Sequence, residues 1–254
     1  MEAGHPVQFA PRANPATDAD QGATRGTTIA KKEQAVRCIE EIGIIPGIRV
    51  ACAEDALFAA EALCAGGIPI VEITMTVPSS AEVLAEVASK HPEVIAGAGT
   101  VWDVEMAHRC VDAGAMFLTS PGVDAEVGEF ARKRNLVAIT EALTPTEALR
   151  AWKAGADFVR IFPCSLVGGP LYIKALRGPH PEVRFIAAGG VNQITVADFI
   201  LAGASAVGIL SDLIHPEAIQ CRQRERIREL SRRFVRMVKQ ARKAPEINAV
   251  GRPA

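Results

Sequence analysis

Two oppositely charged side chains stand inside apolar runs of the chain. Glu72 lies in IPIVEIT (68–74), and Arg160 lies in DFVRIFP (157–163). If both runs are strands, side chains alternate between two faces, so the apolar neighbours turn one way and Glu72 and Arg160 turn the other. A charge in such a place is costly unless it is paired or used. The two residues are therefore candidates for proton transfer or anion binding, and a plain buried ion pair of Glu72 with Arg49 or Arg160 is the structural alternative.

Small and polar residues follow the other apolar runs in the same way. Gly189-Gly190 precedes a helix that is expected to begin near Thr195. Bare backbone amides beside a helix N-terminus can hold a phosphate, although a glycine pair is also an ordinary turn. The remaining positions of this kind are Arg49, Thr100, Ser120-Pro121-Gly122, Thr140-Glu141 and Ser211.

These positions are the ends of eight predicted strands that alternate with amphipathic helices. Four of the helices end in AGG or AGA, near 65, 113, 154 and 202, where glycine supplies the left-handed helix stop. Eight apolar strands with helices between them predict a closed parallel sheet, a single-domain (β/α)8 TIM barrel in the α/β class, with its chemistry at the carboxyl ends of the strands. The strands are expected at 44–50, 68–74, 93–99, 115–120, 136–140, 157–163, 183–189 and 205–210.

A doubly wound open sheet is the alternative architecture. It needs a glycine-rich dinucleotide-binding turn after the first strand, where this chain reads RVACAED. We expect the barrel to span 29–243, between a disordered N-terminal tail (1–28) and a C-terminal tail (244–254). The segment 219–243 has apolar residues at helical spacing and many basic residues, which predicts a solvated helix that closes the barrel.

Composition excludes several classes of function. The chain of 254 residues is 49% apolar and 22% charged, and its net charge of -1 gives no sign of a nucleic-acid partner. Its six cysteines form no CxxC pair and have no histidine at ligand spacing, which favours free thiols over a metal site. Neither a signal peptide nor an apolar run of about 20 residues is found. We therefore expect a cytoplasmic protein with no membrane partner and no metal.

Several sequence blocks, in order, resemble the 2-keto-3-deoxy-6-phosphogluconate (KDPG) and 4-hydroxy-2-oxoglutarate aldolase family. Each block alone is weak, but their order and spacing on consecutive predicted strands are specific, and together they cover about two thirds of the chain, from Gly43 to Leu213. The blocks are IIPGIR, GGIPIVEITMTVP, IAGAGTV, FLTSPG, LTPTEAL, DFVRIFPCSLVGGPLYIKALRGP, AAGGV and AGASAVG.

The resemblance implies a homotrimeric, cofactor-free class I aldolase of the Entner-Doudoroff type. In that family a strand-six lysine forms a Schiff base with a 2-keto-3-deoxy sugar acid phosphate or a related keto acid, and pyruvate and an aldehyde are released. Glu72 matches the family's proton-shuttling glutamate. By the same resemblance, the substrate-binding candidates are Arg49, Thr100, Pro121 and Phe162, and the phosphate-binding candidates are Gly189, Gly190 and Ser211.

This sequence has Arg160 at the position of the Schiff-base lysine. A guanidinium stays protonated above pH ~12 and its charge is delocalised, so it cannot attack a carbonyl as a neutral amine does. Lys153 and Lys174 fall in helical segments that are not expected to reach the barrel mouth. The sequence departs from the family pattern at three further positions. Glu141 stands where relatives usually have glycine, and Ala188 stands where threonine is common. Leu210 stands beside Ser211 where relatives have a glycine, and we expect its side chain to narrow the phosphate-binding turn.

Three functions are consistent with this sequence. The first is the aldolase activity that the family implies. The second is a lyase or decarboxylase in which Arg160 acts electrostatically and Glu72 is the base. The third is a homologue that binds a keto acid or sugar phosphate without catalysis, in which Arg160 pairs with a ligand carboxylate or with Glu141.

Overall fold

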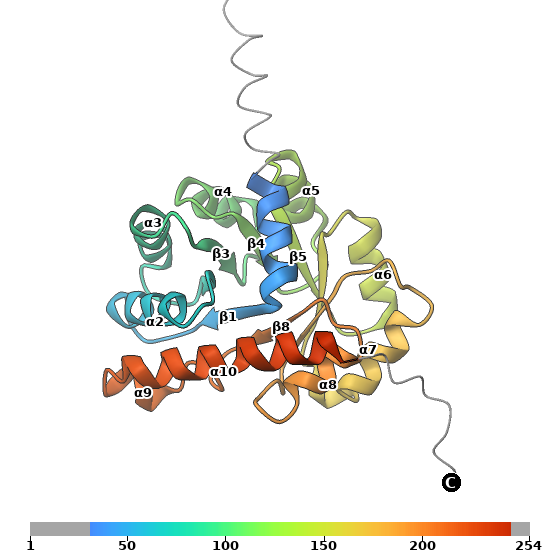
Figure 1. The fold of residues 1–254 in the computed structure, drawn as a ribbon. Helices are drawn as coiled ribbons and strands as arrows, with labels where there is room; N and C mark the ends of the chain where they lie inside the picture. Colours follow the sequence, from blue (N-terminus) through green and yellow to red (C-terminus); the bar gives the residue numbers. More distant parts are fainter. Residues whose placement is uncertain (1–30, 245–254) are drawn as a thin grey trace, which may run out of the picture.

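The computed structural model describes residues 31–244, which form one closed barrel of eight parallel strands (Figure 1). Each strand pairs with the next in sequence, and β8 pairs with β1. This is the predicted (β/α)8 TIM barrel. The strands are β1 (Ile44–Ile48), β2 (Ile70–Thr74), β3 (Ile95–Gly99), β4 (Phe117–Ser120), β5 (Val137–Ala142), β6 (Phe158–Ile161), β7 (Phe185–Ala188) and β8 (Ala206–Ile209).

The helices surround the barrel and alternate with the strands. Their apolar faces pack on the outer side of the sheet, as helices of a parallel barrel do. They are α2 (Ala53–Ala65), α3 (Ser80–Lys90), α4 (Val104–Asp112), α5 (Ala125–Lys133), α6 (Pro145–Lys153), η1 (Cys164–Val167, a 3-10 turn), α7 (Pro170–Arg177), α8 (Val196–Leu201), α9 (Pro216–Gln220) and α10 (Arg224–Lys243).

Four glycines end the helices that precede strands β2, β4, β6 and β8. Each has a positive φ, between 89° and 97°, which is the left-handed stop predicted from the repeated AGG and AGA junctions. They are Gly67, Gly114, Gly155 and Gly203.

A further helix, residues 31–42, lies across the end of the barrel where the strands begin. Lys32 Nζ is 2.8 Å from Asp157 Oδ2, and Arg184 Nε is 2.9 Å from Glu40 Oε1. Asp157 and Arg184 come immediately before β6 and β7, so the helix covers the amino ends of these strands. It leaves the opposite end, where the strands finish, as the mouth of the barrel.

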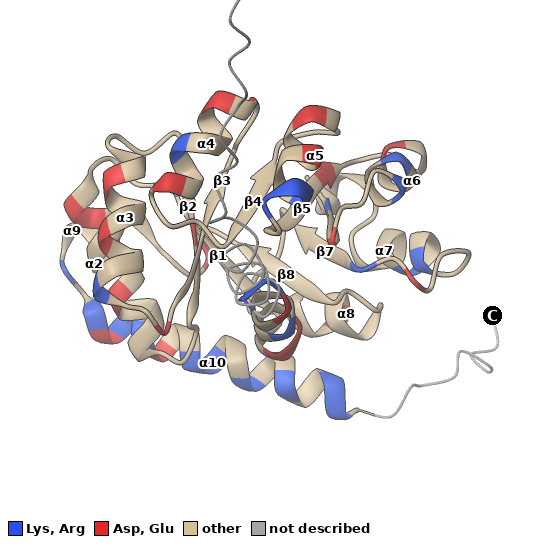
Figure 2. Ribbon diagram, turned by 90° about the horizontal axis from the view of Figure 1, so that it is seen from above, with Lys and Arg blue, Asp and Glu red and all other residues tan. Residues whose placement is uncertain are grey.

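The predicted C-terminal helix is divided in two. α9 and α10 are separated by Cys221–Gln223, where Arg222 has a φ of 50°. α10 lies along α2 and α8 (Figure 1). It buries Ile227, Phe234 and Val238, and most of its Lys and Arg residues, which are blue in Figure 2, are exposed. It closes the helical layer as expected.

Five predicted strands have a different carboxyl end in the structure: β7 and β8 end one residue earlier than expected, and the ends of β1, β5 and β6 differ by two residues. β1 ends at Ile48 and β6 at Ile161, so Arg49 and Phe162 lie in the loops that follow. β5 continues to Ala142 because Glu141 pairs in register with Arg160 of β6. The expected tail 1–28 lies outside the described residues, as does all of 244–254 except Ala244.

Candidate active site

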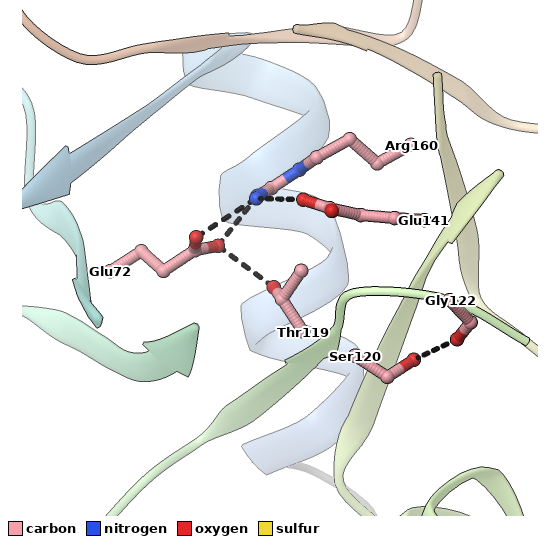
Figure 3. A network of polar contacts seen from close by, with 6 residues as sticks. All are labelled: Glu72, Thr119, Ser120, Gly122, Glu141 and Arg160. Carbon is pink, nitrogen blue, oxygen red and sulfur yellow. Dashed lines mark hydrogen bonds and ion pairs between the residues drawn. The ribbon is translucent and has the colours of Figure 1, made fainter. Parts of the chain in front are cut away.

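Glu72 and Arg160 form a two-pronged ion pair inside the mouth of the barrel (Figure 3). Arg160 Nη1 donates to Glu72 Oε1 at 2.8 Å, and Nη2 donates to Oε2 at 2.5 Å. Both side chains are more than nine-tenths buried, at 7% and 5% exposure. Of the pairings open at the sequence level, the structure has Glu72 with Arg160 and not with Arg49.

Thr119 completes the environment of Glu72. Its hydroxyl Oγ1 donates to Glu72 Oε2 at 2.8 Å, and the hydroxyl is buried at the end of β4. Gly99, beside it on β3, lies so close that a Cβ there would be 2.5 Å from Glu72 Oε1. Three hydrogen bonds and a glycine that leaves room therefore hold the Glu72 side chain in one orientation.

Sequence reasoning did not single out Thr119. Strand alternation could have placed its side chain, because Thr119 stands two positions after Phe117 on one strand and therefore shares the face of Phe117. Recognising that this face meets Glu72 requires the barrel register, in which Thr119 is beside Gly99 and Gly99 is beside Thr74 of β2.

Glu141 is a second carboxyl beside Arg160. The two residues are partners in the β5–β6 ladder, and Glu141 Oε1 is 3.5 Å from Arg160 Nη1. Burial raises the pKa of the Glu141 carboxyl above its ordinary value, Arg160 opposes this, and the charge of Glu72 adds to it. Glu141 is therefore held less tightly than Glu72 and keeps a proton more readily than an exposed glutamate.

Arg160 stays charged in this setting. Burial lowers the pKa of its guanidinium, but the carboxylates of Glu72 and Glu141 outweigh burial and raise the pKa above its ordinary value. Its Nε is buried and has no hydrogen-bond partner among the described residues; a Cβ added to Gly208 would be 3.9 Å from it. The nitrogens of Arg160 donate hydrogen bonds and carry no lone pair for attack on a carbonyl.

All eight lysines of the chain lie on helices outside the barrel. Lys153 is the last residue of α6, and Lys174 is exposed on α7. The others are Lys31, Lys32, Lys90, Lys133, Lys239 and Lys243. No lysine is found on a strand or in a loop at the mouth, so no amine side chain is placed near Glu72.

Each of the four predicted substrate-binding residues lies immediately after the carboxyl end of a different strand, namely β1, β3, β4 and β6. Arg49, Pro121 and Phe162 are exposed, and Phe162, at 45% exposure, lies in the loop after β6 and not in the strand as predicted, because β6 stops one residue before it. Thr100 follows β3 with a φ of 62°. No hydrogen bond joins these four to Glu72 or Arg160 among residues 31–244.

Gly189 and Gly190 form a turn at the end of β7 with φ values of 82° and 84°. A Cβ on Gly190 would be 2.3 Å from Ser165 Cβ, so this turn needs glycine because the loop after β6 lies against it.

Ser211 is exposed after β8. Leu210 packs toward Gly47 of β1, where a Cβ would be 3.2 Å from Leu210 Cγ, so its side chain turns to the β1 side of the mouth.

Comparison with known proteins supports the family seen in the sequence blocks. The family described as "KDPG and KHG aldolase" matches residues 36–230. The chain belongs to the KDPG and KHG aldolase family. It is aldolase-like in sequence and in fold.

Two curated members of the family show the extent of the likeness. The 2-dehydro-3-deoxy-phosphogluconate aldolase of Treponema pallidum is 34% identical over 64% of this chain and 77% of its own length. The KHG/KDPG aldolase of Escherichia coli K12 is 30% identical over 76% of this chain and 90% of its own length. The match thus spans most of each relative.

A solved structure agrees with the barrel described above. The KDPG aldolase of Legionella pneumophila, with pyruvate captured as a covalent carbinolamine intermediate, superposes with a TM-score of 0.73 at 32% identity. The match covers 78% of this chain and 97% of that one. No helix among residues 31–244 has the length and apolar character needed to cross a membrane.

Proposed function

We propose that this aldolase-family protein binds a 2-keto acid or a 2-keto-3-deoxy sugar acid phosphate at the barrel mouth without forming a Schiff base. The observation that carries the proposal is the bidentate Glu72–Arg160 pair, and the sequence resemblance assigns Arg160 to the position of the family's lysine. Class I aldol cleavage needs a neutral amine that attacks the keto carbon, and the buried guanidinium stays protonated. With every lysine on an outer helix, the mouth lacks a substitute.

Residues around the mouth supply the binding groups in this proposal. Arg49 and Thr100 bind the carboxylate side of the ligand, and Pro121 and Phe162 contact its carbon chain. The amides of Gly189 and Gly190, with Ser211, bind a phosphate where one is present. What supports these roles is their place at the carboxyl ends of β1, β3, β4, β6, β7 and β8, where barrel enzymes bind their ligands.

Electrostatic lyase or decarboxylase chemistry is the second candidate. It would use Arg160 to stabilise an enolate and Glu72 as the base. Both carboxylate oxygens of Glu72 already accept hydrogen bonds from Arg160, and Oε2 accepts a third from Thr119, so both are engaged with donors of the protein. Glu72 and Arg160 therefore act first as a fixed, mutually neutralised pair, and noncovalent binding is the function that the geometry favours.

The proposal extends to the protein's location, pathway and oligomeric state, which we infer from the family. We place the protein in the cytoplasm, in carbohydrate metabolism near the Entner-Doudoroff pathway, as a homotrimer of a single barrel domain spanning 29–243 with a tail on either side. Its partners are small molecules and not nucleic acids. The support is the family membership and the near-neutral net charge of -1.

Titration calorimetry with pyruvate, KDPG and inorganic phosphate tests the proposed function. Binding of pyruvate or KDPG, weakened by Arg49→Ala and left unchanged by the exposed outer-helix variant Arg177→Ala, is the expected result. Slow release of an aldehyde from KDPG by the wild-type protein, with a reducible covalent intermediate, would contradict the proposal. Absence of binding by all three compounds would also contradict it.

A further inference from the structure

Glu141 and Glu72 hold Arg160 with very different strength. Glu72 makes two short hydrogen bonds to the guanidinium and accepts a third from Thr119, and it is almost wholly buried. Glu141 makes one contact of 3.5 Å, at the limit of a hydrogen bond, and its side chain is 20% exposed. Of the two carboxyls, only Glu141 can leave Arg160 without exposing a buried charge.

We infer that Glu141 is the exchangeable partner of Arg160, and that an incoming keto-acid carboxylate takes its place on Nη1 while Glu141 binds a proton. This inference rests on the proposed function, because it names how the same site accepts its ligand. The ligand class is a small monoanion whose carboxylate accepts one charge-assisted hydrogen bond from Nη1.

Of the three guanidinium nitrogens of Arg160, Nη1 is the one that a ligand can reach. Glu72 occupies the edge formed by Nη1 and Nη2, and Thr119 and Gly99 fix Glu72 in place. Nε, which has no hydrogen-bond partner within residues 31–244, is buried beside Gly208. The contact that a ligand can replace is therefore the one that Nη1 makes with Glu141.

The charges around Glu141 explain why a proton accompanies the ligand. The charged groups that face it are Arg160 on β6, Glu72 on β2 and Arg49 after β1. A ligand carboxylate added while Glu141 is ionised would set three carboxylates around one buried guanidinium, with only the exposed Arg49 to offset them. Protonation of Glu141 keeps the local charge unchanged, and burial already raises the pKa of this carboxyl.

Coupling of this kind has a definite sign. The binding form carries a proton that free Glu141 loses at higher pH, so the Kd for the ligand is constant below the pKa of free Glu141 and rises above it. At its steepest, uptake of one proton increases the Kd by about tenfold per pH unit. Glutamine at 141 is neutral at every pH and removes the dependence.

Calorimetric titration of the full-length protein with pyruvate, from pH 5 to pH 8, tests the inference. At each pH, two buffers of different ionisation enthalpy report the protons taken up per pyruvate bound. The expected result is uptake approaching one proton in the upper part of the range for the wild type, and none for Glu141→Gln, which also binds pyruvate more tightly than the wild type at pH 8. Glu126→Gln, at an exposed position in the first turn of α5, is the matched control and should behave as the wild type.

The outcomes separate the inference from the proposed function. Pyruvate binding by the wild type with no proton uptake, or with uptake that persists in Glu141→Gln, overturns the exchange and leaves noncovalent binding intact. Failure of both proteins to bind pyruvate at any pH overturns the proposed function and the exchange with it. The buffer comparison on the wild type decides the matter even if Glu141→Gln does not fold.

Discussion

Arg160 of β6 and Glu72 of β2 meet through two parallel hydrogen bonds, with Nη1 2.8 Å from Oε1 and Nη2 2.5 Å from Oε2. Because both side chains are buried, each charge depends on the other for its place in the protein. The mouth of the barrel therefore contains a fixed ion pair in place of a nucleophile. It also makes stability and site chemistry inseparable at these two positions.

Removal of one partner should be strongly destabilising. Glu72→Gln leaves the buried guanidinium without its counter-charge, and we expect the free energy of unfolding to fall by about 3–5 kcal/mol. The double variant Glu72→Leu with Arg160→Met replaces both charges by apolar groups and should recover most of the loss. Urea unfolding measures both. A loss below about 1 kcal/mol for Glu72→Gln would show that the pair is not buried as described.

Gly99 should be needed for the orientation of Glu72. A methyl group there would lie 2.5 Å from Glu72 Oε1, so Gly99→Ala must displace the carboxylate from Arg160. We expect a loss of about 1–3 kcal/mol in unfolding free energy. Gly122→Ala, where nothing lies within 4 Å of the new Cβ, is the control and should change stability by less than about 0.5 kcal/mol. Equal effects of the two changes would contradict this account.

Glu141 should make stability fall as the pH rises. Burial raises its pKa in the folded protein above that of the unfolded chain, in spite of Arg160. The stabilisation is therefore complete below the unfolded pKa, about 4.3, and is lost as the pH passes upward through the folded pKa. Relative to the wild type, Glu141→Gln should gain unfolding free energy between pH 4 and pH 8. Urea melts across this range, with Glu126→Gln as control, check the trend; a difference that stays constant with pH would contradict it.

The alternation of side chains along strands predicted much of this site. Period two placed Glu72 and Arg160 on the inner face, and the repeated AGG and AGA junctions located four helix ends that the structure confirms. Such patterns work because they depend only on the chain's own geometry.

The remaining features depend on distances across the barrel. Sequence could not decide between Arg49 and Arg160 as the partner of Glu72, because the choice depends on where β1 ends and on how far a side chain reaches across the interior. Phe162 was predicted inside a strand but lies in the loop that follows, since β6 stops at Ile161. The place of Glu141 inside β5 depends on its pairing with β6, which no local pattern shows.

Borohydride trapping with pyruvate, read by intact-protein mass spectrometry, tests the central claim most directly. Arg160→Lys restores an amine at the floor of the mouth and should gain the mass of one reduced pyruvate adduct. Arg177→Lys, which adds a lysine on the exposed side of α7, should not. For the wild type we predict no adduct, because the buried guanidinium paired with Glu72 offers no lone pair to the keto carbon. A stoichiometric pyruvate adduct on the wild-type protein would contradict the account.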